Sequence, residues 1–223
     1  MIKEKVLDTW EDLEFWKSEH WQSIQEKLDV LDRDHTSYNP ERHLIFASLD
    51  ATPLDKVHVA FIGQDPYPTK KCCTGFAFSI PAFIGEFPPT LNVIFKELKR
   101  DLRVVRQNGD LTSWTEQGVL LWNAIPTCLT LKSKSHDWTS WEVLTTEIVN
   151  HLNSKGIVFI LVGSVARRYA SLVNTSVNRL IEVAHPSPRG QRNAVKPFHN
   201  SRIFSRCNAY LVELGKSTID WSK

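Results

Sequence analysis

The stretch KVHVAFIGQDPYP, residues 56–68, joins an apolar run directly to a polar cluster. The run Val57–Ile62 is typical of a strand that is buried on both faces of a parallel sheet. An amide, a carboxylate and a phenol follow at once, held between prolines, in the segment Gly63–Pro68. An ordinary exit loop needs no carboxylate stiffened by its neighbours. We therefore interpret this cluster as one wall of a functional site at the end of a strand.

The rest of the chain alternates between compact apolar runs and helical patterns. Three further runs are typical of buried strands, namely Val119–Trp122, Ile157–Val162 and Leu180–Ala184. Apolar residues at helical spacing predict helices over 90–105, 138–152, 164–172 and 201–214. This alternation favours an α/β fold, with a central, small, twisted parallel sheet of about four strands and helices on both faces. A single domain is expected to span residues 1–223.

The N-terminal region is expected to be mostly helical. Thr9-Trp-Glu-Asp12 resembles a capping box, and the apolar spacing after it predicts an amphipathic helix over 10–32. A loop with Tyr38-Asn39-Pro40 then leads to a short helical piece near 41–49.

Composition and charge exclude several classes of protein. No apolar run approaches the length of a membrane span, and the N-terminus lacks the apolar core of a signal peptide, so a cytoplasmic or nuclear protein is expected. The four cysteines form no Cys-x-x-Cys pair, which favours reduced thiols over a disulfide framework or a metal site. Residues 1–55 carry a net charge of −7 and residues 56–223 a net charge of +9. A one-sided basic surface suits a polyanion, although an ordinary solvated face is the alternative.

Each predicted strand is followed by polar residues. The four ends carry Gly63-Gln64-Asp65, Asn123, Gly163-Ser164 and His185-Pro-Ser187. In a parallel α/β sheet the carboxyl ends of the strands share one edge, where ligands bind. We therefore predict that these side chains, which lie up to about 120 residues apart, converge on one site.

The side chains at these ends suit one kind of chemistry. Asp65 can orient a water or offset positive charge, Asn123 can bind the edge of a base, and His185 can stabilise a departing anion. Neither a metal-ligand spacing nor a nucleophilic Ser or Cys motif accompanies them. Hydrolysis of an N-glycosidic bond needs these three functions, because its transition state resembles an oxocarbenium ion.

An ordered set of motifs across nearly the whole chain resembles family 1 uracil-DNA glycosylases. The motifs are Ile45-Phe-Ala47, Thr52-Pro-Leu-Asp-Lys-Val57, Gly63-Gln-Asp-Pro-Tyr67, Gly75-Phe-Ala-Phe-Ser79, Pro88-Pro-Thr-Leu91, Phe95-Lys-Glu-Leu98, Gln117-Gly-Val-Leu-Leu-Trp-Asn123, Ser135-His136, Trp141-Glu142, His185-Pro-Ser-Pro188 and Ile219-Asp-Trp221. The resemblance implies a monofunctional glycosylase that flips uracil out of DNA, releases the free base and leaves an abasic site, as the first step of base excision repair. It implies no cofactor and no metal. It also implies a monomer that acts on single- or double-stranded DNA, with proteinaceous glycosylase inhibitors or replication proteins as further partners.

The resemblance also implies roles for the residues at the strand ends. Asp65 would position the attacking water, and His185 would donate to uracil O2 as the base leaves. Gln64 would shape the uracil pocket and Phe78 would stack on the flipped base. Tyr67 would press against uracil C5, where thymine carries a methyl group. The amide of residue 123 would pair with O4 and N3–H, a pattern that cytosine reverses, and such a mismatch discriminates by ~10⁴ or more.

The implied DNA contacts include three departures from the family pattern. Phosphate-gripping positions fall on Thr90, Ser164 and Ser187, and the cations expected along the DNA are Lys70, Lys71, Arg189 and Arg192. Pro68 stands where the family usually has His, Arg189 where a Leu wedges into the duplex, and Gly190 where a further Ser is usual. The Pro68 and Arg189 features are similar to those of poxvirus members. We expect these changes to alter substrate preference and turnover rather than the reaction.

Several alternatives stay open at this level. Tyr67 and Phe78, taken singly, are as well explained as core aromatics, and His185 as a loop histidine. Asp65 is compatible with an Asx turn ahead of its proline, and His136 is interpreted as structural. Two other functions compete, namely a DNA-bound replication accessory with little catalysis and a glycosylase for another base. The presence of Asp65, Asn123 and His185 argues against the first, and the Tyr67 barrier together with Asn123 argues against the second.

Overall fold

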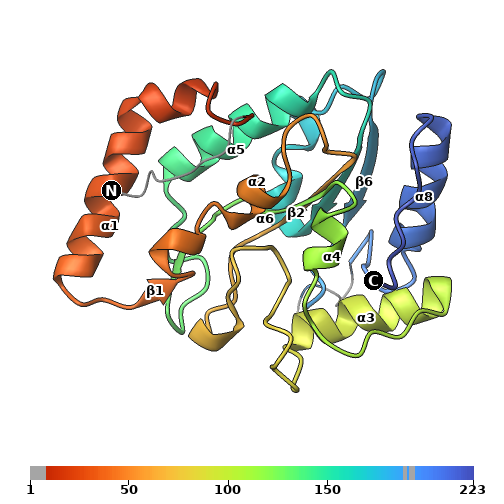
Figure 1. Cartoon of the computed structure of the whole chain (residues 1–223), viewed down its shortest axis with the longest axis horizontal. Helices are drawn as coiled ribbons and strands as arrows, with labels where there is room; N and C mark the ends of the chain where they lie inside the picture. The colour runs from red at the N-terminus through yellow and green to blue at the C-terminus, as the bar shows by residue number, and fades with distance from the viewer. Residues whose placement is uncertain (1–8, 188–189, 191–193) are drawn as a thin grey trace.

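The computed structural model describes residues 9–187, 190 and 194–223. Its centre is a four-stranded, all-parallel sheet in the order β3-β2-β5-β6 (Figure 1). The strands are β2 (Val59–Gly63), β3 (Val119–Asn123), β5 (Val158–Val162) and β6 (Arg179–Val183). In register, Ile62 lies beside Trp122 on one side and Leu161 on the other. The predicted α/β fold is confirmed, and each strand lies within two residues of the apolar run that predicted it.

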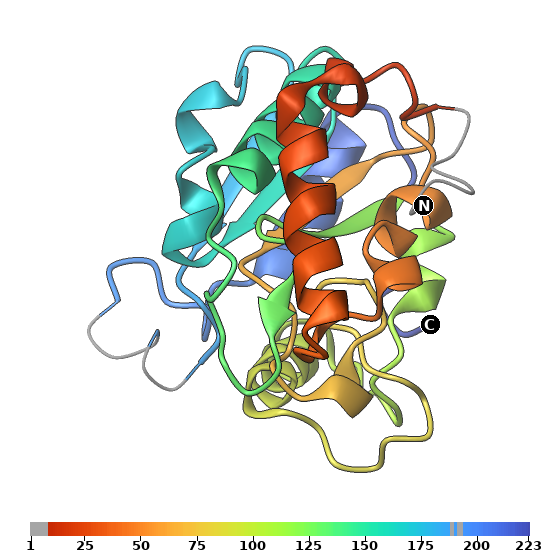
Figure 2. The same ribbon diagram turned by 90° about the vertical axis from the view of Figure 1, so that its left-hand side faces the viewer.

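Helices cover both faces of the sheet because both faces of its central strands are apolar. Ala60 and Ile62 face one hydrophobic core, which contains α1 (Glu19–Arg33) and α5 (Thr139–Leu152). Val59 and Phe61 face the other core, which contains α3 (Pro89–Leu102) and α8 (Ile203–Glu213). Figure 2 shows α1 lying across the outside of the first layer. The alternation of side chains along each strand thus supplies two separate cores.

Shorter elements complete the architecture. They are η1 (Glu14–Lys17), β1 (Tyr38–Asn39), η2 (Arg42–Leu44), α2 (Ala47–Ala51), η3 (Lys70–Cys72), α4 (Thr112–Thr115), β4 (Cys128–Leu129), α6 (Gly163–Arg167) and η4 (Ala170–Leu172). The helix predicted over 164–172 is therefore two pieces, α6 and η4. The antiparallel pair β1–β4 was not predicted, because strands of two residues leave no periodic pattern. None of the helices in the described part of the chain is both long and apolar enough to cross a bilayer.

The predicted helix over 10–32 is wrong in its first half. The chain forms the 3₁₀ turn η1, passes through Ser18 in an extended conformation, and begins α1 only at Glu19. Thr9 does not cap a helix, because its hydroxyl accepts a hydrogen bond from the amide of Leu54 at 2.9 Å. The carboxylate of Glu147 on α5 accepts the amides at the start of η1 instead. A tertiary contact here replaces the local cap that the sequence pattern indicates.

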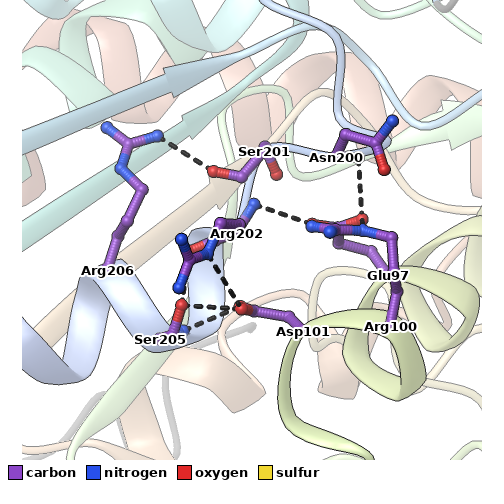
Figure 3. Close-up of polar contacts among 8 residues, drawn as sticks. All are labelled: Glu97, Arg100, Asp101, Asn200, Ser201, Arg202, Ser205 and Arg206. Carbon is purple, nitrogen blue, oxygen red and sulfur yellow. Dashed lines mark hydrogen bonds and ion pairs between the residues drawn. The ribbon is translucent and has the colours of Figure 1, made fainter.

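A buried carboxylate on α3 ties this helix to the segment before α8 (Figure 3). The Glu97 side chain is 0% exposed. It accepts hydrogen bonds from the amides of Asn200 at 2.9 Å and Arg202 at 2.7 Å. The guanidinium of Arg100 donates to both of its oxygens, at 2.8 and 2.6 Å. Glu97 therefore supplies the hydrogen-bond acceptors that water would otherwise provide for two backbone amides and one guanidinium.

A second carboxylate of α3 caps the first turn of α8. Asp101 accepts the amide of Ser205 at 2.8 Å and its hydroxyl at 2.6 Å. Arg202, the residue before the helix, has a left-handed backbone (φ 55°) and supplies no side-chain cap of its own. The N-terminus of α8 is thus satisfied from a neighbouring helix, as Figure 3 shows.

Candidate active site

The loops that follow β2 and β3 run side by side at the carboxyl edge of the sheet. The Gly63 carbonyl accepts a hydrogen bond from the amide of Ala124 at 3.1 Å, and the Gln64 carbonyl accepts one from Ile125 at 2.9 Å. In both views these loops gather at the lower end of the molecule (Figure 1, Figure 2). These backbone hydrogen bonds, which lie beyond the ends of the two strands, therefore fix the position of Asp65 relative to Asn123.

A cavity of about 110 Å³ opens at this edge. The residues that were predicted from the sequence and line it are Gln64, Asp65, Tyr67, Phe78, Thr90, Asn123 and His185. They come from the loops after β2 and β6, from the last residue of β3 and from the first turn of α3. The predicted convergence is thus confirmed for Asp65, Asn123 and His185, whereas Ser164 and Ser187 do not line the cavity.

The Asp65 carboxylate is held by three donors. Its Oδ1 accepts the side-chain amide of Gln64 at 2.7 Å. Its Oδ2 accepts the Ser133 hydroxyl and the Lys134 backbone amide, each at 2.6 Å. Sequence reasoning missed Ser133 and Lys134. They lie in a short polar segment without periodicity, and the only signal was its Ser and Lys content next to the Ser135-His136 motif.

His185 lies against a glycine that begins α6. A Cβ at Gly163 would come within 3.1 Å of the His185 Cβ, and Gly163 has a φ of +88°, which other residues rarely adopt. Burial lowers the pKa of His185 below its ordinary value, the Asp65 carboxylate opposes this, and the nearby Lys134 cation adds to it. The imidazole is therefore neutral at pH 7, and one ring nitrogen carries a proton that it can donate.

Tyr67 and Phe78 form one wall of the cavity. The Tyr67 hydroxyl donates to the Phe78 carbonyl at 2.9 Å, and burial raises the pKa of this phenol well above its usual range. Phe78 has a left-handed backbone (φ 67°), which costs about 1–2 kcal/mol in a residue with a side chain. Its ring packs on Phe61 of β2 with centroids 5.3 Å apart. Such a strained position persists only where the surroundings hold it, and here the Tyr67 hydroxyl and the Phe61 ring do so.

Asn123 is the polar residue least explained by the fold alone. Its side chain lies at the cavity, the residue is only 6% exposed, and its amide makes no hydrogen bond to any side chain or backbone group in the described ranges. Its Oδ1 lies 3.0 Å from where a Cβ would stand on Gly63. The side-chain donor and acceptor of Asn123 are therefore available to a ligand in the cavity that presents both an acceptor and a donor.

The backbone of the Asp65–Pro68 turn is held from three sides. The Pro68 carbonyl accepts the side-chain amide of Asn39 at 3.0 Å and the amide of Leu131 at 2.8 Å. The Cys73 thiol donates to the Tyr67 carbonyl at 2.9 Å. All four cysteines are free in the structure. The β1–β4 pair, which includes Asn39, thus supports the site.

Only some of the residues that were predicted to contact DNA line the cavity. Thr90 lines it, whereas Ser164 is exposed at the start of α6. The Ser187 hydroxyl accepts the amide of Gly190 at 3.1 Å. Lys70 lies 3.7 Å from the Glu41 carboxylate. The remaining predicted cations are Lys71, which is exposed, and Arg189 and Arg192, which lie outside the described residues.

Two further observations concern residues that could hold a metal. Within the described ranges, no three His, Cys, Asp or Glu side chains are placed to bind a metal ion. His136 is buried, bonds the Thr127 hydroxyl through Nδ1 at 2.9 Å and stacks on Trp138 with centroids 4.2 Å apart. Burial lowers the pKa of His136 to about 4. The interpretation of His136 as structural is therefore confirmed.

Comparison with known proteins decides the family. The model of the Uracil DNA glycosylase superfamily matches residues 49–212. This chain belongs to that superfamily. The uracil-DNA glycosylase of Streptococcus thermophilus is 41% identical over 206 residues, covering 92% of each chain. That of Campylobacter fetus subsp. fetus is 36% identical over 226 residues, covering 99% of this chain and 95% of the relative.

Solved structures show the same fold. Mimivirus uracil-DNA glycosylase superposes with a TM-score of 0.86 at 24% identity, covering 96% of this chain and 86% of that one. A variant of the mimivirus protein in complex with UGI gives the same TM-score. The sheet and its two helical layers therefore have the fold of these uracil-DNA glycosylases.

Proposed function

We propose that this chain is a monofunctional, family 1 uracil-DNA glycosylase. It flips uracil out of DNA and hydrolyses its N-glycosidic bond, which releases uracil and leaves an abasic site for base excision repair. The observation that carries this proposal is the convergence of Asp65, Asn123 and His185 on a cavity of about 110 Å³. Relatives up to 41% identical that are named uracil-DNA glycosylases support it.

Asp65 acts on the sugar side of the reaction. Cleavage builds positive charge on the sugar, and a carboxylate nearby stabilises that charge electrostatically. The same carboxylate orients the attacking water and takes up its proton. Because three donors already hold Asp65, little reorganisation is needed during the reaction.

His185 and Asn123 act on the uracil base. A neutral His185 donates a hydrogen bond to uracil O2 and stabilises the anion that leaves. The Asn123 amide pairs with O4 and N3–H, whereas cytosine would leave these buried groups unpaired. Phe78 stacks on the base, Gln64 shapes the pocket, and the Tyr67 ring blocks the C5 methyl group of thymine.

The phosphate backbone is expected to lie along Thr90, Ser164 and Ser187. Further cations are supplied by Lys70, Lys71, Arg189 and Arg192. Lys70 must leave Glu41 to reach a phosphate, which an exposed pair allows at little cost. No metal or cofactor takes part in this scheme.

The proposal extends to the assembly and its partners. It includes a monomer built as a single domain over 1–223. The mimivirus variant bound to UGI supports recognition of this chain by a proteinaceous inhibitor. Replication proteins are further candidate partners. We infer a cytoplasmic location, or a nuclear one if the source is a eukaryote or its virus.

The direct test uses oligonucleotides that carry one uracil, one thymine or one mispaired thymine, incubated with the protein in EDTA. We expect abasic sites at uracil alone, detected by alkaline cleavage, in both single and double strands. Cleavage at thymine without cleavage at uracil would refute the proposed specificity.

A DNA-bound replication accessory remains the second candidate, and the Pro68 and Arg189 departures favour it. DNA binding without cleavage of any of these substrates would establish it. The presence of Asp65, Asn123 and His185 in one cavity favours the enzyme.

Gly63→Ala is expected to lower the rate of uracil excision by about 10²-fold, because small displacements of binding groups have effects of this size. An added Cβ would stand 2.8 Å from the Phe78 ring and 3.0 Å from Asn123 Oδ1. Single-turnover kinetics measure the effect. Gly85→Ala is the matched control, since a Cβ there meets nothing within 4 Å. Equal rates for the two variants would show that the cavity tolerates the displacement.

A further inference from the structure

The two oxygens of the Asp65 carboxylate have unequal surroundings. A carboxylate oxygen has two lone pairs that accept hydrogen bonds. Both are used on Oδ2, by the Ser133 hydroxyl and the Lys134 amide. On Oδ1 only the Gln64 amide is bound within the described residues, so one lone pair remains for a further donor. The side chain is thus a carboxylate with one anchored and one available oxygen.

The loop that carries these donors is built to present them. Leu131 and Lys134 both have left-handed backbones, with φ of 65° and 59°. Each such conformation costs about 1–2 kcal/mol in a residue with a side chain. The loop reverses between these two residues, and this turn directs the Ser133 hydroxyl and the Lys134 amide at the same oxygen.

A set of internal bonds holds this strained loop in place. The Ser135 hydroxyl accepts the amide of Leu129 at 2.6 Å and donates to the Lys132 carbonyl at 2.8 Å. The amide of Leu131 donates to the Pro68 carbonyl at 2.8 Å, which joins the loop to the turn after Asp65. The loop and the turn therefore form one rigid unit, and strain that persists in such a unit points to function.

We propose that Ser133 is a positioning residue for catalysis, which together with the Lys134 amide anchors Oδ2 of Asp65 and leaves Oδ1 to orient the attacking water. The inference rests on the proposed uracil excision. Ser133 acts through Asp65 and does not itself contact the base. Without its hydroxyl, the carboxylate keeps only the Gln64 and Lys134 donors, so its orientation about the terminal bond is less restricted.

The test compares Ser133→Ala with Ser133→Thr, which keeps the hydroxyl, in the full chain. Steady-state rates on a uracil oligonucleotide give kcat and KM. Loss of one hydrogen bond to a charged group predicts a fall in kcat of about 10-fold, with KM changed less than about twofold. Ser133→Thr should restore most of the wild-type kcat.

The control is Lys132→Ala, which removes an exposed cation from the same loop without touching Asp65. A wild-type protein that does not excise uracil would refute the proposed function itself. An active wild type with unchanged kcat in Ser133→Ala would refute the positioning role alone. A fall in kcat that comes with a lower Tm and that Ser133→Thr does not rescue would also overturn it, because a merely structural role behaves in that way.

The amide of Lys134 cannot be removed as cleanly. Proline is the only residue without an amide proton, and its ring holds φ near −65°, far from the 59° observed at this position. A Lys134→Pro variant would change the loop as well as the bond. Ser133 is therefore the residue that isolates the anchoring of Oδ2.

Discussion

Asp65→Asn lowers the rate of uracil excision by about 10²–10⁴-fold, the usual contribution of a positioned acid or base. The amide is neutral, so it neither offsets positive charge on the sugar nor takes a proton from water. Its geometry also fails, because two donors occupy the Oδ2 position and keep the amide oxygen there. The NH₂ group then replaces Oδ1 and faces the Gln64 amide, donor against donor.

The matched control for this prediction is Asp137→Asn. Asp137 is half exposed, lies 3.7 Å from Arg168 and does not line the cavity. We expect this variant to cleave at the wild-type rate in the same single-turnover assay. Binding of Asp65→Asn to a uracil oligonucleotide should persist, since the phosphate contacts are untouched. An Asp65→Asn variant that cleaves uracil at the wild-type rate would refute the assignment of Asp65 as the catalytic carboxylate.

Glu97→Ala lowers the free energy of unfolding by about 1–3 kcal/mol, the usual cost of leaving buried donors without an acceptor. The change leaves the amides of Asn200 and Arg202 without an acceptor, whereas the Arg100 guanidinium, whose side chain is 33% exposed, can still reach water. Chemical denaturation measures the loss. Glu97→Gln should be intermediate, because its oxygen still accepts one of these donors. Glu86→Ala, at an exposed position, is the control and should change stability by less than about 0.5 kcal/mol.

The Glu97 contribution should depend on pH. Burial raises the pKa of Glu97, but hydrogen bonds from Arg100 and from the amides of Arg202 and Asn200 outweigh burial and hold it below the ordinary value of 4.5. A carboxyl with a lowered folded-state pKa stabilises the protein above the unfolded value and loses this contribution as the pH falls through the folded value. The stability gap between wild type and Glu97→Ala is therefore full at pH 7 and narrows below 4.5. A gap that is constant from pH 7 to pH 3 would contradict the charged state of Glu97.

The sequence was informative where a local pattern has one structural solution. Runs such as Val119–Trp122 are too short and too apolar for exposed helices, and their alternation with helical spacing leaves a parallel sheet as the simplest fold. A parallel sheet then brings the carboxyl ends of its strands to one edge. For that reason Asp65, Asn123 and His185 were predicted to share a site although they lie far apart along the chain.

The N-terminal helix shows where local patterns fail. The sequence at Thr9 matches a capping box, but the Thr9 hydroxyl accepts a hydrogen bond from the amide of Leu54. The carboxylate of Glu147 caps η1 instead. Each of these contacts joins residues more than 40 positions apart. A window of a few residues contains no information about such partners. Tertiary contacts therefore override the local helix propensity.

The sequence by itself determined the fold class, the strand ends that form the site and the residue types that act on a base and a sugar. Only the tertiary structure decided how those residues are held. Ser133 meets Asp65 across 68 residues, and Glu97 meets Arg202 across 105. Hydrophobic periodicity reflects which face of a helix or strand is buried, and it can be recognised within a few consecutive residues. A hydrogen bond needs its two atoms within about 3 Å in the right direction, and only the packed chain establishes that.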